Sequence, residues 1–305
     1  MGTPDFAVPI LEALLTTDVE VVLVVTQPDR PVGRRQKLTP PPVKRVAEQH
    51  KIPVFQPEKM QKEYEEVLSY NPDIVITAAY GQLLPVELLE APEFGCINVH
   101  ASLLPELRGG APIHYSILQG KKETGITIMY MAEKLDAGDI ISQQSLKIGQ
   151  ADHVGILHDK LAEIGASLLL DTLPSIFNKT NERIKQNDAE ATFAPNITRE
   201  QEKINWEKDQ EAVYNQIRGL HPWPVAYTNF EGKRMKVWWA EMDDGSYDAA
   251  PGEVVAVEDS SFTVVCGDGK GVNITDIQLA GRKRMLVAEF LRGNKEAISI
   301  GQKVE

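Results

Sequence analysis

The feature that most constrains the fold of this chain is a series of almost continuous apolar, β-branched runs in its first half. The runs are Val19–Thr26, Asp73–Ala79 and Cys96–His100. Such runs suit strands that are buried on both faces of a parallel sheet. Helical patterns lie between them at residues 42–51 and 63–70. Because strands and helices alternate, we expect an α/β fold with an open, mostly parallel, Rossmann-like sheet.

Two later segments extend this first domain. Gly125–Met131 and Asp139–Leu146 flank a turn that is rich in Asp and Gly. This arrangement predicts a hairpin at or near the edge of the sheet. The segment Val154–Phe177 carries a long helical pattern. We therefore expect an N-terminal domain over residues 1–188.

The second half of the chain has a different pattern. Polar sequence around residues 186–205 predicts a linker, which we place at 189–202. Beyond it, a helix is predicted at Gln210–Gly219, followed by short strands that alternate with turns such as Pro251–Gly252. This pattern is typical of a small β-barrel of the OB-like type. We expect it to form a C-terminal domain over residues 203–305.

The start of the chain is unusual for an α/β sheet. Thr3, Pro4 and Asp5 are typical of a helix N-terminus, and Pro9 falls in the first turn, where its missing N–H is tolerated. A glycine-containing turn into a helix normally follows a strand, and none precedes it here. We expect either that the natural gene product begins further upstream or that the sheet lacks an inner strand, and we favour the first.

Composition limits the classes of function. The formal net charge is −12 at pH 7, which argues against binding of nucleic acid over the whole surface. No apolar run approaches the ~20 residues that cross a bilayer, and the N-terminus has no secretory pattern. Cys96 and Cys266 lie far apart, which indicates reduced thiols. We therefore expect a cytoplasmic protein that does not enter a membrane.

One segment departs from the acidic balance of the chain. Residues 26–45 carry six basic side chains against a single acidic one, Asp29. Charge runs of this kind are usually solvated surface loops. The alternative is a local contact with phosphates, which becomes the better interpretation only if other residues predict a nucleic-acid substrate.

The residues that predict chemistry lie between positions 97 and 141. Asn98 and His100 are two apart in a predicted strand, so their side chains share one face near its carboxyl end, where open α/β sheets bind ligands. An amide and an imidazole together can hold a carbonyl oxygen on which negative charge develops. Asp136 lies in a turn that can return a carboxylate toward the imidazole, where it would favour the charged ring and fix its orientation.

Each of these residues has a simpler structural interpretation on its own. Asn98 can be a turn former, His100 a satisfied core histidine, and Asp136 a residue that stabilises the hairpin turn. The functional interpretation depends on their combination and spacing. A metal site is not predicted, because the six histidines and two cysteines form neither HExxH nor CxxC. The chain also lacks GxGxxG and the Walker-type phosphate loop.

The pattern N-x-H-x-S-L-L-P-x-x-R-G-x-x-P-I, followed by L-D-x-G-D, resembles the 10-formyltetrahydrofolate-dependent formyltransferase superfamily. The resemblance extends over the whole chain to the members that act on aminoacyl-tRNA. It implies that Asn98, His100 and Asp136 form the catalytic trio. It also implies two folate-binding segments, which comprise Ser102, Leu103, Leu104 and Pro105 and, before them, Gln82, Leu83 and Leu84.

The resemblance further implies an activity. A formyl group would pass from 10-formyltetrahydrofolate, a cosubstrate, to the α-amino group of methionine on initiator tRNA, for the initiation of translation. The amine would attack directly, without a covalent enzyme intermediate, and Asn98 and protonated His100 would hold the oxyanion. The basic loop, with Arg30, Arg34, Arg35 and Lys37, would grip the acceptor end of the tRNA. The C-terminal domain would help to hold the RNA.

Other functions remain open at this stage. Relatives that share the trio formylate glycinamide ribonucleotide or sugar nucleotides, and one hydrolyses formyltetrahydrofolate. The second domain counts against the first of these, and the arginine-rich loop distinguishes the tRNA-specific enzymes from the other two. A non-catalytic folate-binding or tRNA-binding module is the alternative from another class, and the intact trio argues against it. We expect a monomer with no obligate protein partner as the default for a protein that engages one asymmetric RNA.

Overall fold

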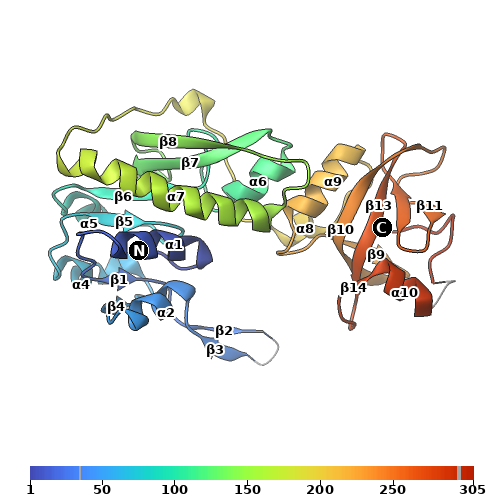
Figure 1. The fold of residues 1–305 in the computed structure, drawn as a ribbon, viewed down its shortest axis with the longest axis horizontal. Helices are drawn as coiled ribbons and strands as arrows, with labels where there is room; N and C mark the ends of the chain where they lie inside the picture. Colours follow the sequence, from blue (N-terminus) through green and yellow to red (C-terminus); the bar gives the residue numbers. More distant parts are fainter. Residues whose placement is uncertain (34–35, 294–296) are drawn as a thin grey trace. The chain divides into compact units, whose positions relative to one another are not determined.

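The structure is a computed structural model that describes residues 1–33, 36–293 and 297–305 (Figure 1). The chain forms two compact units, which are described separately. Unit 1 contains residues 1–112, 123–147 and 158–195, and unit 2 contains the rest of the described chain. No helix in these ranges combines the length and the apolar character that crossing a membrane requires.

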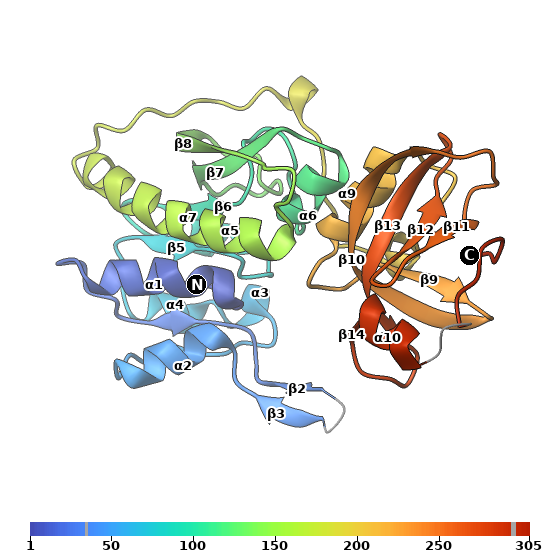
Figure 2. The same cartoon turned by 45° about the vertical axis from the view of Figure 1, so that its right-hand side comes forward.

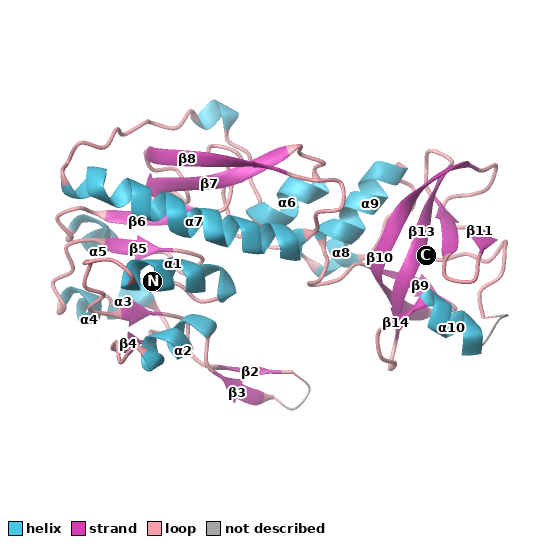
Figure 3. Cartoon of the chain, viewed as in Figure 1, coloured by secondary structure: helices cyan, strands magenta, loops and turns pink. Residues whose placement is uncertain are grey.

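The strands of unit 1 confirm an α/β fold with a mostly parallel sheet (Figure 3). They are β1 (Val24–Val25), β4 (Val54–Phe55), β5 (Val75–Thr77), β6 (Cys96–His100), β7 (Glu123–Tyr130) and β8 (Ile140–Lys147). β1 pairs with β4 and β5 pairs with β6, both in parallel. β7 and β8 follow β6 as an antiparallel hairpin, and β8 forms the edge, as the sequence predicted.

The first two residues connect the two parallel pairs. The Gly2 N–H donates to the Val25 carbonyl at 3.0 Å, and the Ala78 N–H donates to the Met1 carbonyl at 2.9 Å. Met1 and Gly2 therefore lie between β1 and β5 and pair with both. The strand predicted at Val19–Thr26 is confirmed only at Val24–Val25, because residues 20–23 make no backbone hydrogen bond within the part of the chain that the structure describes.

The helices of unit 1 cover this sheet, and a short hairpin, β2 (Arg30–Val32) with β3 (Lys37–Thr39), projects from its body (Figures 1 and 2). The helical elements are the 3₁₀ helices η1 (Asp5–Ala7) and η2 (Asp188–Glu190) and the α-helices α1 (Val8–Leu15), α2 (Pro42–Gln49), α3 (Met60–Glu63), α4 (Glu65–Leu68) and α5 (Val86–Glu90). The helix predicted at 63–70 is thus divided between α3 and α4. Helices α6 (Pro112–Leu118) and α7 (Val154–Phe177) contain residues of both units.

Unit 2 contains one antiparallel sheet of six strands in the order β11-β12-β13-β10-β9, with β14 beside β13. Its elements are α8 (Arg199–Glu202), α9 (Gln210–Gly219), β9 (Tyr227–Phe230), β10 (Lys233–Ser246), β11 (Val254–Val257), β12 (Phe262–Val265), β13 (Lys270–Leu279), β14 (Met285–Leu286) and α10 (Val287–Gly293). Helix α9 has the predicted bounds. A closed OB-like barrel is not confirmed, because in the described residues β9 and β11 do not pair with each other. Instead, the last residues bond to both ends of the sheet, through Glu305 to Asn229 and through Gln302 to Val254.

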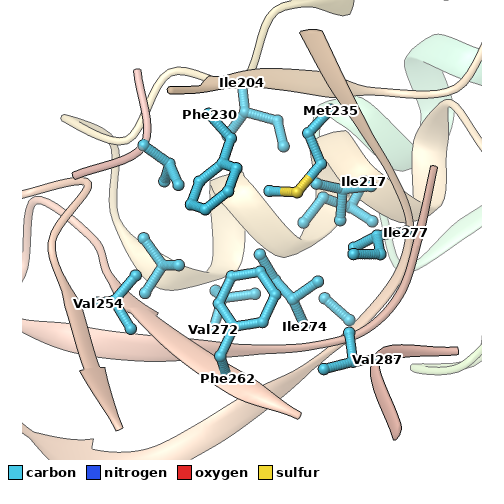
Figure 4. Close-up of a cluster of buried hydrophobic side chains, with 14 of the residues drawn as sticks. Ile204, Ile217, Phe230, Met235, Val254, Phe262, Val272, Ile274, Ile277 and Val287 are labelled. Carbon is cyan, nitrogen blue, oxygen red and sulfur yellow. The ribbon is translucent and has the colours of Figure 1, made fainter. Parts of the chain in front are cut away.

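The core of unit 2 lies between its sheet and α9 (Figure 4). Ile217 of α9 is 1% exposed, and it belongs to the same cluster as Phe230, Met235, Phe262 and Ile274 of the strands. Burial of each such side chain contributes about 1.5–3 kcal/mol. The alternation of apolar residues along the strands therefore folds one face of the sheet onto the apolar face of the helix.

Candidate active site

Strand β6 places two polar side chains on one face of the sheet of unit 1. Asn98 lies opposite Thr77 of β5, and His100 lies opposite Thr127 of β7. Because successive side chains of a strand alternate between faces, Asn98 and His100 point to the same side. His100 is the last residue of β6, at the carboxyl end of the strand.

The amide of Asn98 is oriented by a neighbouring strand. The Thr77 hydroxyl lies 2.8 Å from Asn98 Oδ1 and 3.1 Å from the Ile97 carbonyl. A hydroxyl has one proton, and we assign it to the shorter contact. The Asn98 oxygen is then occupied, and its NH₂ group points away from Thr77 as a hydrogen-bond donor.

The ring of His100 is buried and is held by one backbone carbonyl. Its Nε2 lies 3.1 Å from the Leu107 oxygen, and the residue is 5% exposed. A carbonyl only accepts hydrogen bonds, so Nε2 carries a proton. The second nitrogen, Nδ1, therefore faces the rest of the site, 3.7 Å from Asp136 Oδ2. This distance exceeds that of a direct hydrogen bond.

Asp136 belongs to the turn between β7 and β8. Its Oδ2 accepts a hydrogen bond from the Gly109 N–H at 2.8 Å, and its side chain is 13% exposed. The residue has φ = +48°, a left-handed conformation that is uncommon for residues other than glycine and least unfavourable for Asn and Asp. The turn therefore depends on other contacts to keep the carboxylate beside His100.

Gln186 and Arg108 provide those contacts. The Gln186 amide donates to the carbonyls of Asp136 and Gly138, both at 2.8 Å. Its oxygen accepts from Arg108 Nε at 3.1 Å and from Arg108 Nη2 at 2.8 Å. Arg108 is 1% exposed. The two side chains thus connect the Asp136 turn to the loop that supplies the Gly109 N–H.

The remaining guanidinium nitrogen of Arg108 extends this hydrogen-bond network to the surface. Its Nη1 donates to Asp188 Oδ1 at 2.8 Å, and Lys134 bonds the other carboxylate oxygen at 2.6 Å. The hydrogen bond from Lys134 lowers the pKa of Asp188 most, and the hydrogen bond from Arg108 lowers it further. The Arg108 charge therefore has an ionised partner.

The segment Ser102–Pro105 is fixed mainly through its backbone. The Thr127 hydroxyl donates to the Ser102 carbonyl at 2.7 Å and accepts from the Leu104 N–H at 3.1 Å. Gln143 of β8 donates to the Leu104 carbonyl at 2.9 Å. Ser102 and Leu104 are buried, whereas Leu103 and Pro105 are partly exposed. Within this segment, Leu103 and Pro105 are therefore the side chains with appreciable exposed surface.

The segment Gln82–Leu84 lies after β5. The Gln82 side chain is engaged with the protein, because its oxygen accepts from the Met60 N–H at 2.8 Å. Leu84 is buried, whereas Leu83 is 54% exposed. No hydrogen bond of the described chain joins this segment to Asn98 or His100.

The basic loop corresponds to the hairpin of β2 and β3. Arg30 and Lys37 lie on its two strands, and both are exposed. Arg30 forms an ion pair of 2.7 Å with Glu58, which is also exposed. Arg34 and Arg35, the other two predicted tRNA contacts, lie outside the described residues.

Sequence reasoning predicted the trio, and it did not predict the residues that hold these side chains in place. Gln186 and Arg108 were not singled out, although Arg108 lies within the long motif. Thr127 and Gln143 were missed as well, although strand pairing aligns them with His100 in one cross-strand row. The detectable signal was a threonine inside the apolar run of β7, directly opposite a predicted catalytic residue. In the described ranges, no group of three His, Cys, Asp or Glu residues is placed to hold a metal ion.

Comparison with known proteins places the chain in a class. Residues 1–173 match the formyl transferase family, and residues 196–295 match the C-terminal domain of formyl transferases. Among solved structures, the N-formyltransferase of Helicobacter canadensis with folinic acid and dTDP-3-aminofucose has a TM-score of 0.68 and 22% identity, over 90% of this chain and 96% of that one. HypX of Aquifex aeolicus with tetrahydrofolic acid has a TM-score of 0.60 and 19% identity, over 81% of this chain and 43% of that one. At these identities the likeness concerns the fold, which is that of a formyl transferase.

Curated proteins of higher sequence identity show which family of formyl transferases the chain belongs to. The methionyl-tRNA formyltransferase of Halalkalibacterium halodurans is 58% identical over 99% of this chain and 96% of its own length. That of Lysinibacillus sphaericus is 57% identical over 99% of this chain and 97% of its own length. The chain belongs to the methionyl-tRNA formyltransferase family.

Proposed function

We propose that this enzyme transfers the formyl group of 10-formyltetrahydrofolate to the α-amino group of methionine on initiator tRNA, for the initiation of translation. The full-length similarity to methionyl-tRNA formyltransferases supports the substrates. The observation that carries the chemistry is the approach of Asp136 to within 3.7 Å of His100, on the strand that also carries Asn98. We assign the catalytic roles to these three residues.

The first role is to hold the formyl oxygen. When the neutral amine attacks the formyl carbon, a C–N bond forms and the carbonyl electron pair moves to the oxygen. Asn98 offers its NH₂ group, because its own oxygen faces Thr77. Protonated His100 offers the Nδ1–H, because Nε2 is engaged with the Leu107 carbonyl. Loss of one such preorganised donor lowers kcat about 10²–10³-fold in acyl-transfer enzymes.

The second role is to move a proton. The attacking nitrogen must lose one proton, and N10 of the folate must gain one as its bond to the formyl carbon breaks. Asp136 Oδ2 already accepts from the Gly109 N–H and lies beyond hydrogen-bonding distance of His100. We therefore assign the transfer to a water between the amine and the Asp136 carboxylate.

The folate would contact two segments. We assign the first to Ser102, Leu103, Leu104 and Pro105 and the second to Gln82, Leu83 and Leu84. The first segment suits this role because hydrogen bonds to Thr127 and Gln143 hold its backbone and leave Leu103 and Pro105 partly exposed. The exposed Leu83 offers an apolar contact from the second. The structures of relatives with bound folates support this cosubstrate.

The tRNA would contact the β2–β3 hairpin through Arg30, Arg34, Arg35 and Lys37. The exposure of Arg30 and Lys37 supports a role in binding phosphates. Unit 2 offers further cations on its sheet, where Arg234 stacks on Tyr227 at 3.9 Å. The net acidic charge of the chain confines RNA binding to such local groups.

The other expectations from the sequence stay proposals. They are a monomer in the cytoplasm that acts without a metal, an OB-like character of the second domain, and domain limits at 1–188 and 203–305 with the linker at 189–202. The bonds from the last residues to both ends of the unit 2 sheet support the barrel-like character.

The function is tested by incubating the chain with 10-formyltetrahydrofolate and methionyl initiator tRNA and measuring formyl-methionyl-tRNA. We expect activity in the unmodified chain and a loss of about 10²–10³-fold in kcat for Asn98→Ala and for His100→Ala. The exposed His50 provides a matched control, His50→Ala, with unchanged activity. Full activity in both site variants would remove the catalytic assignment. Formylation of an amino sugar nucleotide in place of the tRNA would instead remove the substrate assignment.

A further inference from the structure

A network of side-chain hydrogen bonds lies at the carboxyl ends of three strands of unit 1. Gln27 comes shortly after β1, Gln56 directly after β4 and Gln82 after β5. Because hydrogen bonds connect these glutamines, they lie at one edge of the sheet, and this is the edge where open α/β sheets bind ligands. The network joins two segments that are assigned to different substrates, the β2–β3 hairpin and Gln82–Leu84.

An ion pair closes the base of the β2–β3 hairpin. Asp29 directly precedes β2, and Lys44 lies in α2, the helix that follows β3 (Figure 2). Lys44 Nζ donates to both carboxylate oxygens of Asp29 at 3.0 Å and to Gln56 Oε1 at 2.8 Å. Each of its three ammonium protons thus has an acceptor within the protein. Although Lys44 belongs to the basic segment, its charge therefore holds the hairpin and is not offered to a phosphate.

Gln56 connects this ion pair to the end of β1. Its amide donates to Asp29 Oδ1 at 2.8 Å and to the Gln27 carbonyl at 2.9 Å. The hydrogen bond from Gln56 lowers the pKa of Asp29 most, and the hydrogen bond from Lys44 lowers it further. Asp29 is thus a charged acceptor, and hydrogen bonds to charged groups are the stronger ones. The base of the hairpin is therefore fixed relative to Gln27.

The side chain of Gln27 continues the network to the segment that is assigned to the folate. Its Nε2 donates to the Tyr80 carbonyl at 3.1 Å, and its Oε1 accepts from Gln82 Nε2 at 3.3 Å. Gln82 Nε2 also donates to the Pro57 carbonyl at 3.2 Å, and Gln82 Oε1 accepts from the Met60 N–H at 2.8 Å. Both amide groups of Gln82 are therefore occupied within the protein, and they hold the backbone of this segment in place.

We propose that Gln27, Gln56 and Lys44 are positioning residues that make the binding of the two substrates interdependent. On the proposed function, on which this inference rests, a folate seated against Gln82–Leu84 restrains that segment. The network passes the restraint to the base of the hairpin, where the tRNA binds. Because the hairpin is then ordered before the tRNA arrives, less conformational entropy is lost when the RNA binds. Such coupling is reciprocal, so the tRNA strengthens the binding of the folate by the same factor.

The experiment measures the Kd of each of two ligands for the full chain, with and without the other ligand. The ligands are methionyl initiator tRNA and folinic acid, which is bound in the structure of a relative and carries its formyl group on N5 instead of N10. The variant Gln27→Leu removes the side-chain bonds to Tyr80 and Gln82 and keeps the backbone carbonyl that Gln56 binds. Gln49→Leu, at an exposed position of α2, is the matched control.

We expect folinic acid to tighten tRNA binding at least about fivefold in the unmodified chain and in Gln49→Leu, and the tRNA to tighten folinic acid binding by the same factor. In Gln27→Leu both factors should fall to about one, while the Kd of the tRNA alone stays within about twofold. A residue that only stabilised the hairpin would instead raise the Kd of the tRNA alone. Gln56→Leu interrupts the same network at a second point, so it should lower both factors to the same extent.

The outcomes separate this inference from the proposed function. If both ligands bind to the unmodified chain and neither changes the Kd of the other, the inference is overturned and the proposed function stands. Unchanged factors in Gln27→Leu or in Gln56→Leu would overturn it as well. Failure of either ligand to bind the unmodified chain would remove the proposed function, and this inference with it.

Discussion

At the residue scale, the candidate site consists of polar atoms that are each oriented by one neighbour. Thr77 turns the Asn98 amide, the Leu107 carbonyl fixes the His100 ring, and the Gly109 N–H holds the Asp136 carboxylate. None of these neighbours is itself a candidate for the reaction. The site is therefore preorganised mainly by groups that the backbone positions.

Because Gln186 supports the Asp136 turn, its substitution leads to a testable prediction. In Gln186→Leu, the carbonyls of Asp136 and Gly138 no longer have their donor, and the buried guanidinium of Arg108 no longer has the Gln186 oxygen as its acceptor. Each unsatisfied buried group costs roughly 1–3 kcal/mol. We expect the Asp136 turn to lose its position, so that kcat falls about 10–100-fold while KM for 10-formyltetrahydrofolate changes little. Steady-state kinetics measures kcat and KM separately and so checks this prediction.

Gln144, another glutamine of unit 1, provides the control. It lies on β8 with an exposed side chain, so Gln144→Leu leaves the turn intact and keeps kcat unchanged. A fall in kcat of the same size in both variants would show that Gln186 acts only through general stability.

The sequence predicted the trio because its members lie in one strand and in one turn, so that their spacing along the chain indicates which side chains can come together. Asn98 and His100 are two apart, and the L-D-x-G-D turn follows them in the next hairpin. Gln186 lies 50 residues beyond the carbonyl it binds. A contact of that sequence separation arises from the tertiary fold and leaves no periodic signal along the chain.

At the element scale, the parallel strands and the long helix were predictable where local patterns are strong. Strand β6 and helices α7 and α9 have the expected bounds. Strand β1 does not, because a strand exists only where a neighbour completes its ladder, and residues 20–23 make no backbone hydrogen bond in the described chain. An apolar sequence pattern indicates that a segment is buried, but it does not indicate which strand pairs with that segment.

The positive charge of the β2–β3 hairpin leads to a prediction about tRNA binding. The double variant Arg34→Ala and Arg35→Ala removes two cations that can each neutralise a phosphate of the tRNA. We expect KM for the tRNA to rise and kcat to stay within about twofold. The slope of log KM against log salt concentration should fall by about 0.7–0.9 for each phosphate that is no longer neutralised. Formylation assays between low and moderate salt measure both.

The matched control is Lys179→Ala, which removes a surface cation that pairs with Glu93. The salt slope should be unchanged in that variant. If the double variant keeps the slope of the unmodified chain, the hairpin does not neutralise phosphates.

At the scale of the whole molecule, the position of the first residue makes folding dependent on pH. Burial lowers the pKa of the Met1 amine from 8.0 to about 5. Between these values the unfolded chain binds a proton that the folded chain does not, so the free energy of unfolding rises with pH. We expect a gain of up to about 4 kcal/mol from pH 5 to pH 8, with no further contribution from this group at higher pH. Urea denaturation across this range measures it.

The comparison protein is the same chain acetylated at its N-terminus, which has no amine to titrate. Its stability should vary less between pH 5 and pH 8. His221, whose pKa is lowered by burial and then by the charge of His153, contributes equally to both proteins. Parallel pH profiles for the two would contradict the prediction.

The bonds of Gln186 also decide where this molecule can be divided. Residues 186–194 have the composition of a connector, yet Gln186 holds the Asp136 turn and the Ala194 N–H bonds to the Arg108 carbonyl. A chimaera that keeps only the residues before this stretch would carry Asn98, His100 and Asp136 without these supporting bonds. A chimaera that exchanges unit 2 for the corresponding part of another protein should therefore have its junction after Ala194.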